Sequence, residues 1–207
     1  YAVTRNGLLG LPATPIRAYV RTREGLESPD AGISWLPFLA NEKRQLSKRS
    51  GLTVISHALR SDSTGSIHIS SASAHTPPAI RFNFLSSPLD QEITLAAMRI
   101  ARNIMAAPSM AGILGDEFAP GPSVQTDDEL LDWVKANAET TYHPVGTCKM
   151  GSDPMAVVDD HLQVRGLQGL RVADASIMPT LTSGNTNAPS IMIGEKASAM
   201  VLASAAA

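Results

Sequence analysis

The stretch that decides the fold is LRVADASIMPTLTSGNTNAPSIMIGEKA, residues 170–197. It opens with a short apolar run that ends at an acid, residues 170–174, which predicts a strand. A loop over residues 178–187 follows. Residues 189–202 then predict a helix, because Pro189 falls in its first turn, where proline is tolerated. A strand, a loop and a helix in this order form an α/β unit, whose natural setting is a layered sheet covered by helices.

The first half of the chain has a different pattern. Five short apolar runs bounded by Gly, Pro, Ser or Asp predict strands at 16–21, 33–39, 52–59, 66–70 and 80–85. The fourth and fifth runs alternate apolar and polar residues, which is typical of half-buried antiparallel strands. Residues 63–66 are predicted to form a hairpin turn between two of these runs. The charged segment 41–50 is predicted to be a surface loop or a short helix.

Two helices are predicted in the middle of the chain. The first spans residues 90–107 and ends before Pro108. Thr126 and Glu129 form a capping box that opens the second, which runs to about residue 138. Residues 116–125, rich in Pro and Gly, form the loop between them. The expected apolar face of the first helix consists of Ile93, Ala97, Ile100, Ala101 and Ile104.

These patterns predict an α+β chain with two parts. Residues 1–141 form an antiparallel-sheet domain with helices, and residues 142–207 form an irregular loop followed by the strand–loop–helix unit. A strand–loop–helix unit needs further strands beside it, so we expect its remaining domain to be absent from this chain. The start at Tyr1 rather than Met suggests a piece of a longer protein, and proteolytic maturation is the alternative.

Composition excludes several classes of protein. The 207 residues are 43% hydrophobic and 17% charged, which favours a folded chain over wholesale disorder. The net charge of −2 gives no basic excess for nucleic acid. A single cysteine allows no internal disulfide. The first twenty residues lack the apolar core of a signal peptide, and Glu195 and Lys196 interrupt the apolar tail, so we expect no transmembrane segment. The compartment stays open between a reducing and an oxidising one, and the cytoplasm is the expected location.

Among the histidines, His143 is the candidate for chemistry. It lies in a loop just past a capped helix and is followed by Pro144 and Gly146, and loops carry function more often than element interiors do. On composition alone it could equally be a structural residue. The other histidines are expected in strands or on the surface, and Cys148 is expected to be a small packed residue. No spacing of His, Cys and carboxylates predicts a metal site. The expected strand and surface histidines are His57, His68, His75 and His161.

The second polar stretch is Ser183-Gly-Asn185-Thr-Asn187, directly before the final helix. It can be read as a turn and helix start, which Asn and Gly suit. It can also be read as a site where backbone N–H groups hold an anion or a polar ring edge. No GxSxG elbow, P-loop or GxGxxG fingerprint occurs anywhere in the chain.

Several sequence motifs together resemble those of the glucose–methanol–choline oxidoreductase family. Tyr142-His-Pro-Val-Gly-Thr-Cys-Lys-Met-Gly151 is similar to that family's histidine motif. It is followed in the family's order by Val158-Asp159, Gly169-Leu-Arg-Val-Ala-Asp-Ala-Ser-Ile-Met-Pro179, Ser183-Gly-Asn-Thr-Asn-Ala-Pro189 and Ile193-Gly-Glu-Lys-Ala197. Ser63-Thr-Gly-Ser-Ile67, Pro78-Ala-Ile80 and Asn83-Phe-Leu-Ser86 resemble the substrate domain of the family.

The resemblance implies a flavin enzyme that oxidises alcohols, in which FAD is held mainly by an N-terminal Rossmann-like domain. The chain then corresponds to the C-terminal part: a substrate domain, and a segment that completes the FAD domain. This explains the missing GxGxxG. It also implies that residues 1–207 alone have no activity, because the FAD crevice needs the N-terminal domain.

The resemblance also implies roles for particular residues. His143 corresponds to the general base toward the substrate hydroxyl, and Asn185 to the second active-site position, which is His or Asn in different members. Asp174 and Ala175 correspond to a stretch that contacts FAD near its ribityl and pyrophosphate groups. Thr186 and Asn187 correspond to the backbone near the pyrimidine edge of the flavin, and no metal is implied.

The residue types fit this chemistry. An imidazole with an ordinary pKa near 6.5 can accept a hydroxyl proton at physiological pH. An amide can donate a hydrogen bond to the alkoxide without competing for that proton. The Asn-Ala-Pro motif resembles choline-dehydrogenase-like members more than sugar oxidases. The sequence does not identify the alcohol substrate or the electron acceptor. The rival readings are a non-catalytic ligand-binding or interaction module and an inactive truncated product.

Overall fold

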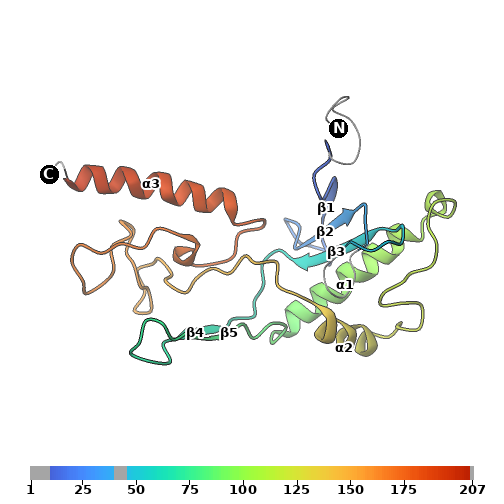
Figure 1. The fold of residues 1–207 in the computed structure, drawn as a ribbon, viewed down its shortest axis with the longest axis horizontal. Helices are drawn as coiled ribbons and strands as arrows, with labels where there is room; N and C mark the ends of the chain where they lie inside the picture. The colour runs from blue at the N-terminus through green and yellow to red at the C-terminus, as the bar shows by residue number, and fades with distance from the viewer. Residues whose placement is uncertain (1–9, 40–45, 206–207) are drawn as a thin grey trace. The chain divides into compact units, whose positions relative to one another are not determined.

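The structure, a computed structural model, describes residues 10–39 and 46–205 (Figure 1). It is a mixed α+β chain with antiparallel sheets, which confirms the predicted fold class. The residues group into two compact units. Among the described residues, the first unit contains 10–39, 46–62 and 85–138, and the second contains 63–84 and 139–205. The predicted division into a substrate domain, residues 1–141, and a segment that completes the FAD domain, residues 142–207, stays a prediction.

The first unit contains a three-stranded antiparallel sheet in the order β1-β2-β3. The strands are β1 (Ile16–Val20), β2 (Ala31–Leu36) and β3 (Thr53–Ala58), so the first three predicted strands are confirmed with shifted ends. The central strand β2 is the most buried, and Ile33 is fully inaccessible to solvent. Part of the predicted loop or short helix at 41–50 lies outside the described residues.

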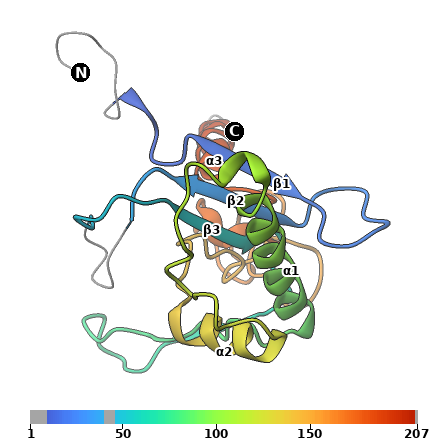
Figure 2. The same ribbon diagram turned by 90° about the vertical axis from the view of Figure 1, so that its right-hand side faces the viewer.

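Helix α1 (Pro88–Met105) packs on β2 and β3, as Figure 2 shows. It begins early relative to the prediction because the Ser87 hydroxyl accepts the Leu89 N–H and proline occupies the first turn. Ile93 and Ala97 pack against Ala31 of the sheet. The predicted apolar face was wrong at its far end, where Ile104 is 40% exposed because the helix extends past its buried stretch.

Helix α2 (Asp127–Asn137) confirms the predicted capping box. The Glu129 N–H donates to the Thr126 hydroxyl, and the Glu129 carboxylate accepts the Thr126 N–H. The N–H groups of Thr126 and Gln125 lower the pKa of Glu129. A lowered pKa means that the ionised carboxylate stabilises the folded state, and that this contribution is lost as the pH falls through the acid range.

The second unit contains a two-stranded ribbon of β4 (Ser66–His68) and β5 (Ala79–Arg81). The predicted hairpin turn at 63–66 is wrong, because β4 pairs with β5 and not with β3. The predicted strand at 80–85 is shorter, because Asn83 and Leu85 adopt positive φ angles of 56° and 57°, which end the extended backbone.

The C-terminal part of the second unit carries two further elements. They are the short 3-10 helix η3 (Ala175–Ile177) and α3 (Asn187–Ala205), which confirms the predicted final helix. The predicted strand at 170–174 was wrong: within the described part of the chain, only Arg171 pairs, in a single bridge with Gln163. An apolar run becomes a strand only where a neighbouring strand offers hydrogen bonds.

No helix in the described ranges is both long and apolar enough to cross a bilayer.

Candidate active site

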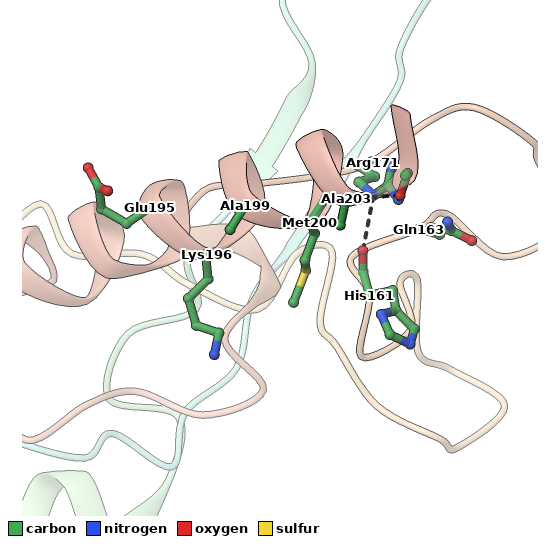
Figure 3. Close-up of a pocket in the computed structure, with 9 residues that line it drawn as sticks. His161, Gln163, Arg171, Glu195, Lys196, Ala199, Met200 and Ala203 are labelled. Carbon is green, nitrogen blue, oxygen red and sulfur yellow. Dashed lines mark hydrogen bonds between the residues drawn. The ribbon is translucent and has the colours of Figure 1, made fainter. Parts of the chain in front are cut away.

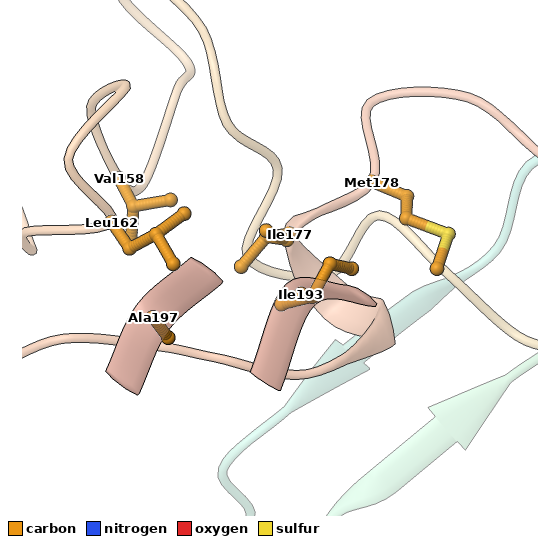
Figure 4. Packing of buried hydrophobic residues seen from close by; sticks show 6 residues of the cluster. All are labelled: Val158, Leu162, Ile177, Met178, Ile193 and Ala197. Atoms are coloured by element: carbon orange, nitrogen blue, oxygen red, sulfur yellow. The ribbon is translucent and has the colours of Figure 1, made fainter. Parts of the chain in front are cut away.

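A small apolar cluster holds the C-terminal segments of the second unit together (Figure 4). Ile177 of η3 and Ile193 of α3 belong to it. Val158 and Leu162 come from the loop before η3 and are almost fully buried. η3 and the first half of α3 are therefore fixed to one another, and so are the loops that precede them. The remaining buried members of the cluster are Met178 and Ala197.

The histidine loop is attached to η3 by backbone hydrogen bonds. Cys148 N–H donates to the Ser176 carbonyl at 3.0 Å, and Met150 N–H donates to the Ile177 carbonyl at 2.7 Å. Between His143 and these bonds lies Gly146, whose φ is +88°. A Cβ at that position lies 3.4 Å from the Met178 carbonyl oxygen. Glycine therefore allows both the left-handed turn and the close approach of the histidine loop to the segment around Met178.

Replacing Gly146 with valine is expected to lower the free energy of unfolding by about 1 to 3 kcal/mol, the usual cost of a side chain in the left-handed region. Crowding against the Met178 carbonyl adds to this cost. Gly166→Val is the matched control, because Gly166 has a φ of +79° and open space around it. Thermal or denaturant unfolding of the full-length protein should show a larger loss for Gly146→Val, and equal losses would contradict the crowding.

His143 and Thr186 meet through their side chains, although 43 residues separate them. The imidazole Nδ1 lies 2.9 Å from the Thr186 Oγ1. His143 is half-buried, whereas Thr186 is only 8% exposed. The two polar stretches that the sequence singled out are thus brought together, and the second ring nitrogen, Nε2, is the one left for other chemistry.

Helix geometry explains why the Thr186 hydroxyl can hydrogen-bond to the His143 ring. Thr186 directly precedes α3, and its carbonyl accepts the Ser190 N–H at 3.0 Å, the first bond of the helix. A threonine at such a position usually accepts an N–H from the second or third helical residue. The third residue of α3 is Pro189, which has no N–H. Of the two usual donors, the third-residue N–H is absent by covalent structure, and only the Ala188 N–H can compete with the histidine for this hydroxyl.

The other predicted site residues lie around this pair. Asn185 is exposed and adjoins Thr186, so the expected second active-site side chain starts one residue from the partner of the histidine. Asn187 is the exposed first residue of α3. Asp174 is exposed and caps η3, with its Oδ1 accepting the Ser176 N–H at 2.8 Å. Ala175, the first residue of η3, is half-buried.

Two carboxylates stabilise the loop between the histidine loop and η3. The Lys149 side chain and the Met155 N–H lower the pKa of Asp153. The Gln163 and His161 N–H groups lower the pKa of Asp159. Because both values are lowered, the two groups support this loop when ionised, and that support is lost as the pH falls through the acid range.

The other predicted polar residues lie apart from this pair. His57 and His68 occupy strands β3 and β4, and His75 is exposed. His161 is also exposed and lines an open groove beside α3, where Arg171 donates to its carbonyl (Figure 3). Cys148 is half-buried. Across residues 10–39 and 46–205, no three His, Cys, Asp or Glu side chains gather as a metal site would require.

Sequence reasoning assigned Thr186 only a backbone role and missed its side-chain contact with His143. The available signal was Pro189, because a proline at the third helical position frees a preceding threonine hydroxyl. Sequence reasoning also missed that residues 63–84 group with the C-terminal segments.

The loop-borne histidine, its threonine partner and the adjoining asparagine lie together at the start of α3. A family model described as GMC oxidoreductase matches residues 61–194. The chain belongs to the GMC oxidoreductase family and corresponds to its C-terminal part.

Relatives with curated descriptions agree with this membership. The chain is 42% identical over 203 residues to an alcohol dehydrogenase [acceptor] of Pseudomonas putida, covering 98% of this chain and 37% of the relative. It is 45% identical over 179 residues to an oxygen-dependent choline dehydrogenase of Cronobacter sakazakii, covering 86% and 32%. The chain therefore spans about a third of the length of these relatives.

Solved structures share the fold. Pyridoxine 4-oxidase from Mesorbium loti superimposes with a TM-score of 0.81 at 28% identity, over 89% of this chain and 37% of the other. An FAD-dependent oxidoreductase from Chaetomium thermophilum gives a TM-score of 0.71 at 27% identity, over 84% and 28%. The architecture described above is thus part of a larger protein in these neighbours.

Proposed function

We propose that this chain supplies the proton-handling half of the active site in an FAD-dependent oxidoreductase that acts on the CH–OH group of a small alcohol. The contact between His143 and Thr186 supports the proposal, because it joins the imidazole of His143 to the residue next to Asn185 in a chain of this family. Similarity to an alcohol dehydrogenase and a choline dehydrogenase supports an alcohol as the substrate class.

The residues present fit an FAD molecule in their chemistry. The first N–H groups of α3, at Asn187 and Ala188, have no partner within the helix and suit the acceptor atoms of a flavin ring edge. Asp174 uses Oδ1 for its cap, which leaves Oδ2 to accept a hydroxyl of the ribityl chain. Asp174, Ala175, Thr186 and Asn187 are thus the residues that would hold the cofactor. When bound, FAD supplies the acceptor for the hydride that leaves the alcohol carbon.

His143 is the proposed base. Oxidation at the alcohol carbon requires that the hydroxyl proton be removed, and an imidazole can accept it near neutral pH. Because Nδ1 is engaged by Thr186, Nε2 is the nitrogen that receives this proton. For Nε2 to carry a lone pair in the neutral ring, Nδ1 must carry the hydrogen and donate it to the threonine oxygen.

Asn185 is the proposed partner of the substrate oxygen. As the proton leaves, negative charge grows on that oxygen, and a side-chain amide can donate a hydrogen bond to it. The amide stays neutral, so it stabilises the charge without taking the proton from His143. Asn185 is exposed in this chain and adjoins the threonine that contacts His143.

The rest of the site is proposed to come from an N-terminal FAD domain, since the relatives are about three times as long. The surface of α3 supports this partner, because Ile191, Met192 and Leu202 are 60%, 52% and 71% exposed. A helix that is apolar on several sides is normally covered. We further propose that residues 1–207 alone do not turn over alcohols. A cytoplasmic location stays a prediction.

The function is tested by purifying the full-length protein, identifying the small molecule released on denaturation, and assaying turnover with an artificial electron-accepting dye. We expect FAD, and dye reduction with at least one alcohol from a panel that includes choline and simple primary alcohols. The chain of residues 1–207 is the control and should be inactive. A full-length protein that binds no flavin, or that oxidises none of the alcohols, would contradict the proposal.

A further inference from the structure

We propose that Thr186 is a positioning residue whose hydroxyl selects the tautomer of His143 in which Nε2 can accept a proton. This inference rests on the proposed function, because it concerns the same histidine. The observation behind it is a different one, the 2.9 Å contact between Nδ1 of His143 and the side-chain hydroxyl of Thr186. The family resemblance gave Thr186 only a backbone role near the flavin.

The contact is shielded from solvent on the threonine side. Thr186 is 8% exposed, so water competes poorly for its hydroxyl. A neutral imidazole has one N–H and one bare nitrogen, and the partner of Nδ1 decides which nitrogen keeps the hydrogen. A hydroxyl that accepts from Nδ1–H leaves the lone pair on Nε2, whereas a hydroxyl that donates to Nδ1 leaves the hydrogen on Nε2.

The start of α3 makes this hydroxyl available as an acceptor and keeps it in place. Pro189 supplies no N–H, so one of the two backbone donors that normally compete for such a hydroxyl is missing and only the Ala188 N–H remains. The Thr186 carbonyl accepts both the N–H and the hydroxyl of Ser190, at 3.0 and 2.6 Å. These bonds fix the backbone from which the hydroxyl projects. The histidine loop is fixed in turn by its bonds to η3.

The test compares two substitutions at one position in the full-length holoenzyme. Thr186→Val keeps the shape and removes the hydroxyl, while Thr186→Ser keeps the hydroxyl and removes the methyl group. We expect kcat to fall about 10- to 100-fold in the valine variant, the usual effect of losing a hydrogen-bond partner behind a functional histidine, and to be largely restored in the serine variant. Flavin content and the KM for the alcohol should change little.

The pH profile of kcat/KM gives a second readout. A hydroxyl that accepts from Nδ1–H favours the protonated ring, so its removal should move the acid limb of the profile to lower pH. Nitrogen NMR of histidine-labelled protein above that limb should show Nδ1 protonated in the wild type, and more Nε2–H in the valine variant.

Undiminished turnover in the valine variant, an acid limb that moves to higher pH, or a wild-type His143 protonated on Nε2 would each overturn the tautomer role. A serine variant as slow as the valine variant would also overturn it, because packing would then be the cause. His143→Ala, measured in parallel, separates the two proposals. If it turns over normally, the proposed function fails; if it is inactive while Thr186→Val is normal, only the role of Thr186 fails.

Discussion

Replacing His143 with alanine in the full-length protein is expected to lower kcat for alcohol oxidation at least a hundredfold while FAD stays bound. A positioned general base contributes about 10²- to 10⁴-fold in rate, and the neighbouring Thr186 and Asn185 side chains are not bases at neutral pH. FAD should remain, because the residues proposed to hold it lie at η3 and at the start of α3. Steady-state turnover and the flavin absorbance of the purified variant provide the measurement.

His161→Ala is the matched control for this variant. His161 belongs to the same unit, and its side chain is 69% exposed. It lines the groove in Figure 3, whose lining includes neither His143 nor Thr186, and its carbonyl rather than its ring accepts from Arg171. Its removal should leave kcat unchanged. Near-normal turnover in His143→Ala would exclude His143 as the base.

Replacing Asn185 with alanine is expected to raise the barrier by about 3 kcal/mol, which corresponds to roughly a 150-fold loss of kcat. The loss follows because the alkoxide oxygen would lose a hydrogen-bond donor at the moment when its charge develops. The effect should appear mainly in kcat, since the donor matters more to the charged oxygen than to the neutral hydroxyl of the bound alcohol. Steady-state kinetics with the best alcohol measure this split.

Asn187→Ala provides the comparison, because Asn187 is also exposed and lies two residues away, at the first position of α3. Its proposed contribution comes from the backbone N–H, which alanine retains. The kcat of Asn185→Ala should therefore be lower than that of Asn187→Ala. If Asn187→Ala has the lower kcat, the donor role belongs to Asn187. The start of α3 would then lie differently with respect to the substrate.

Local signals in the sequence predicted much of the fold, because they depend on neighbouring residues. The capping box of Thr126 and Glu129 was sufficient to place the start of α2, and Pro108 correctly marked the end of the α1 pattern. Pairing between distant segments was harder to predict. The partner of β4 was misassigned because a strand pattern does not specify which other strand will supply its hydrogen bonds.

The predicted strand at 170–174 shows the same limit. Its apolar residues form one bridge among the described residues, between Arg171 and Gln163, and hydrogen bonds from Val164 to Leu170 and from Val172 to Leu162 flank it. The candidate site was likewise predictable in its local features and not in its long-range contact. The two polar stretches around His143 and Asn185 could be singled out from composition and turn residues, whereas the bond from Nδ1 to Thr186 depends on how η3 and α3 pack.

The most direct test of the central claim is the anaerobic reaction of the full-length protein with an oxidisable alcohol, followed by the visible absorbance of the flavin. We expect the absorbance to fall in a single turnover, and to fall more slowly when the carbon bearing the hydroxyl is deuterated, because that C–H bond is broken as electrons leave the alcohol. An absorbance that does not change with any alcohol oxidised by the protein, or the absence of bound flavin, would contradict it.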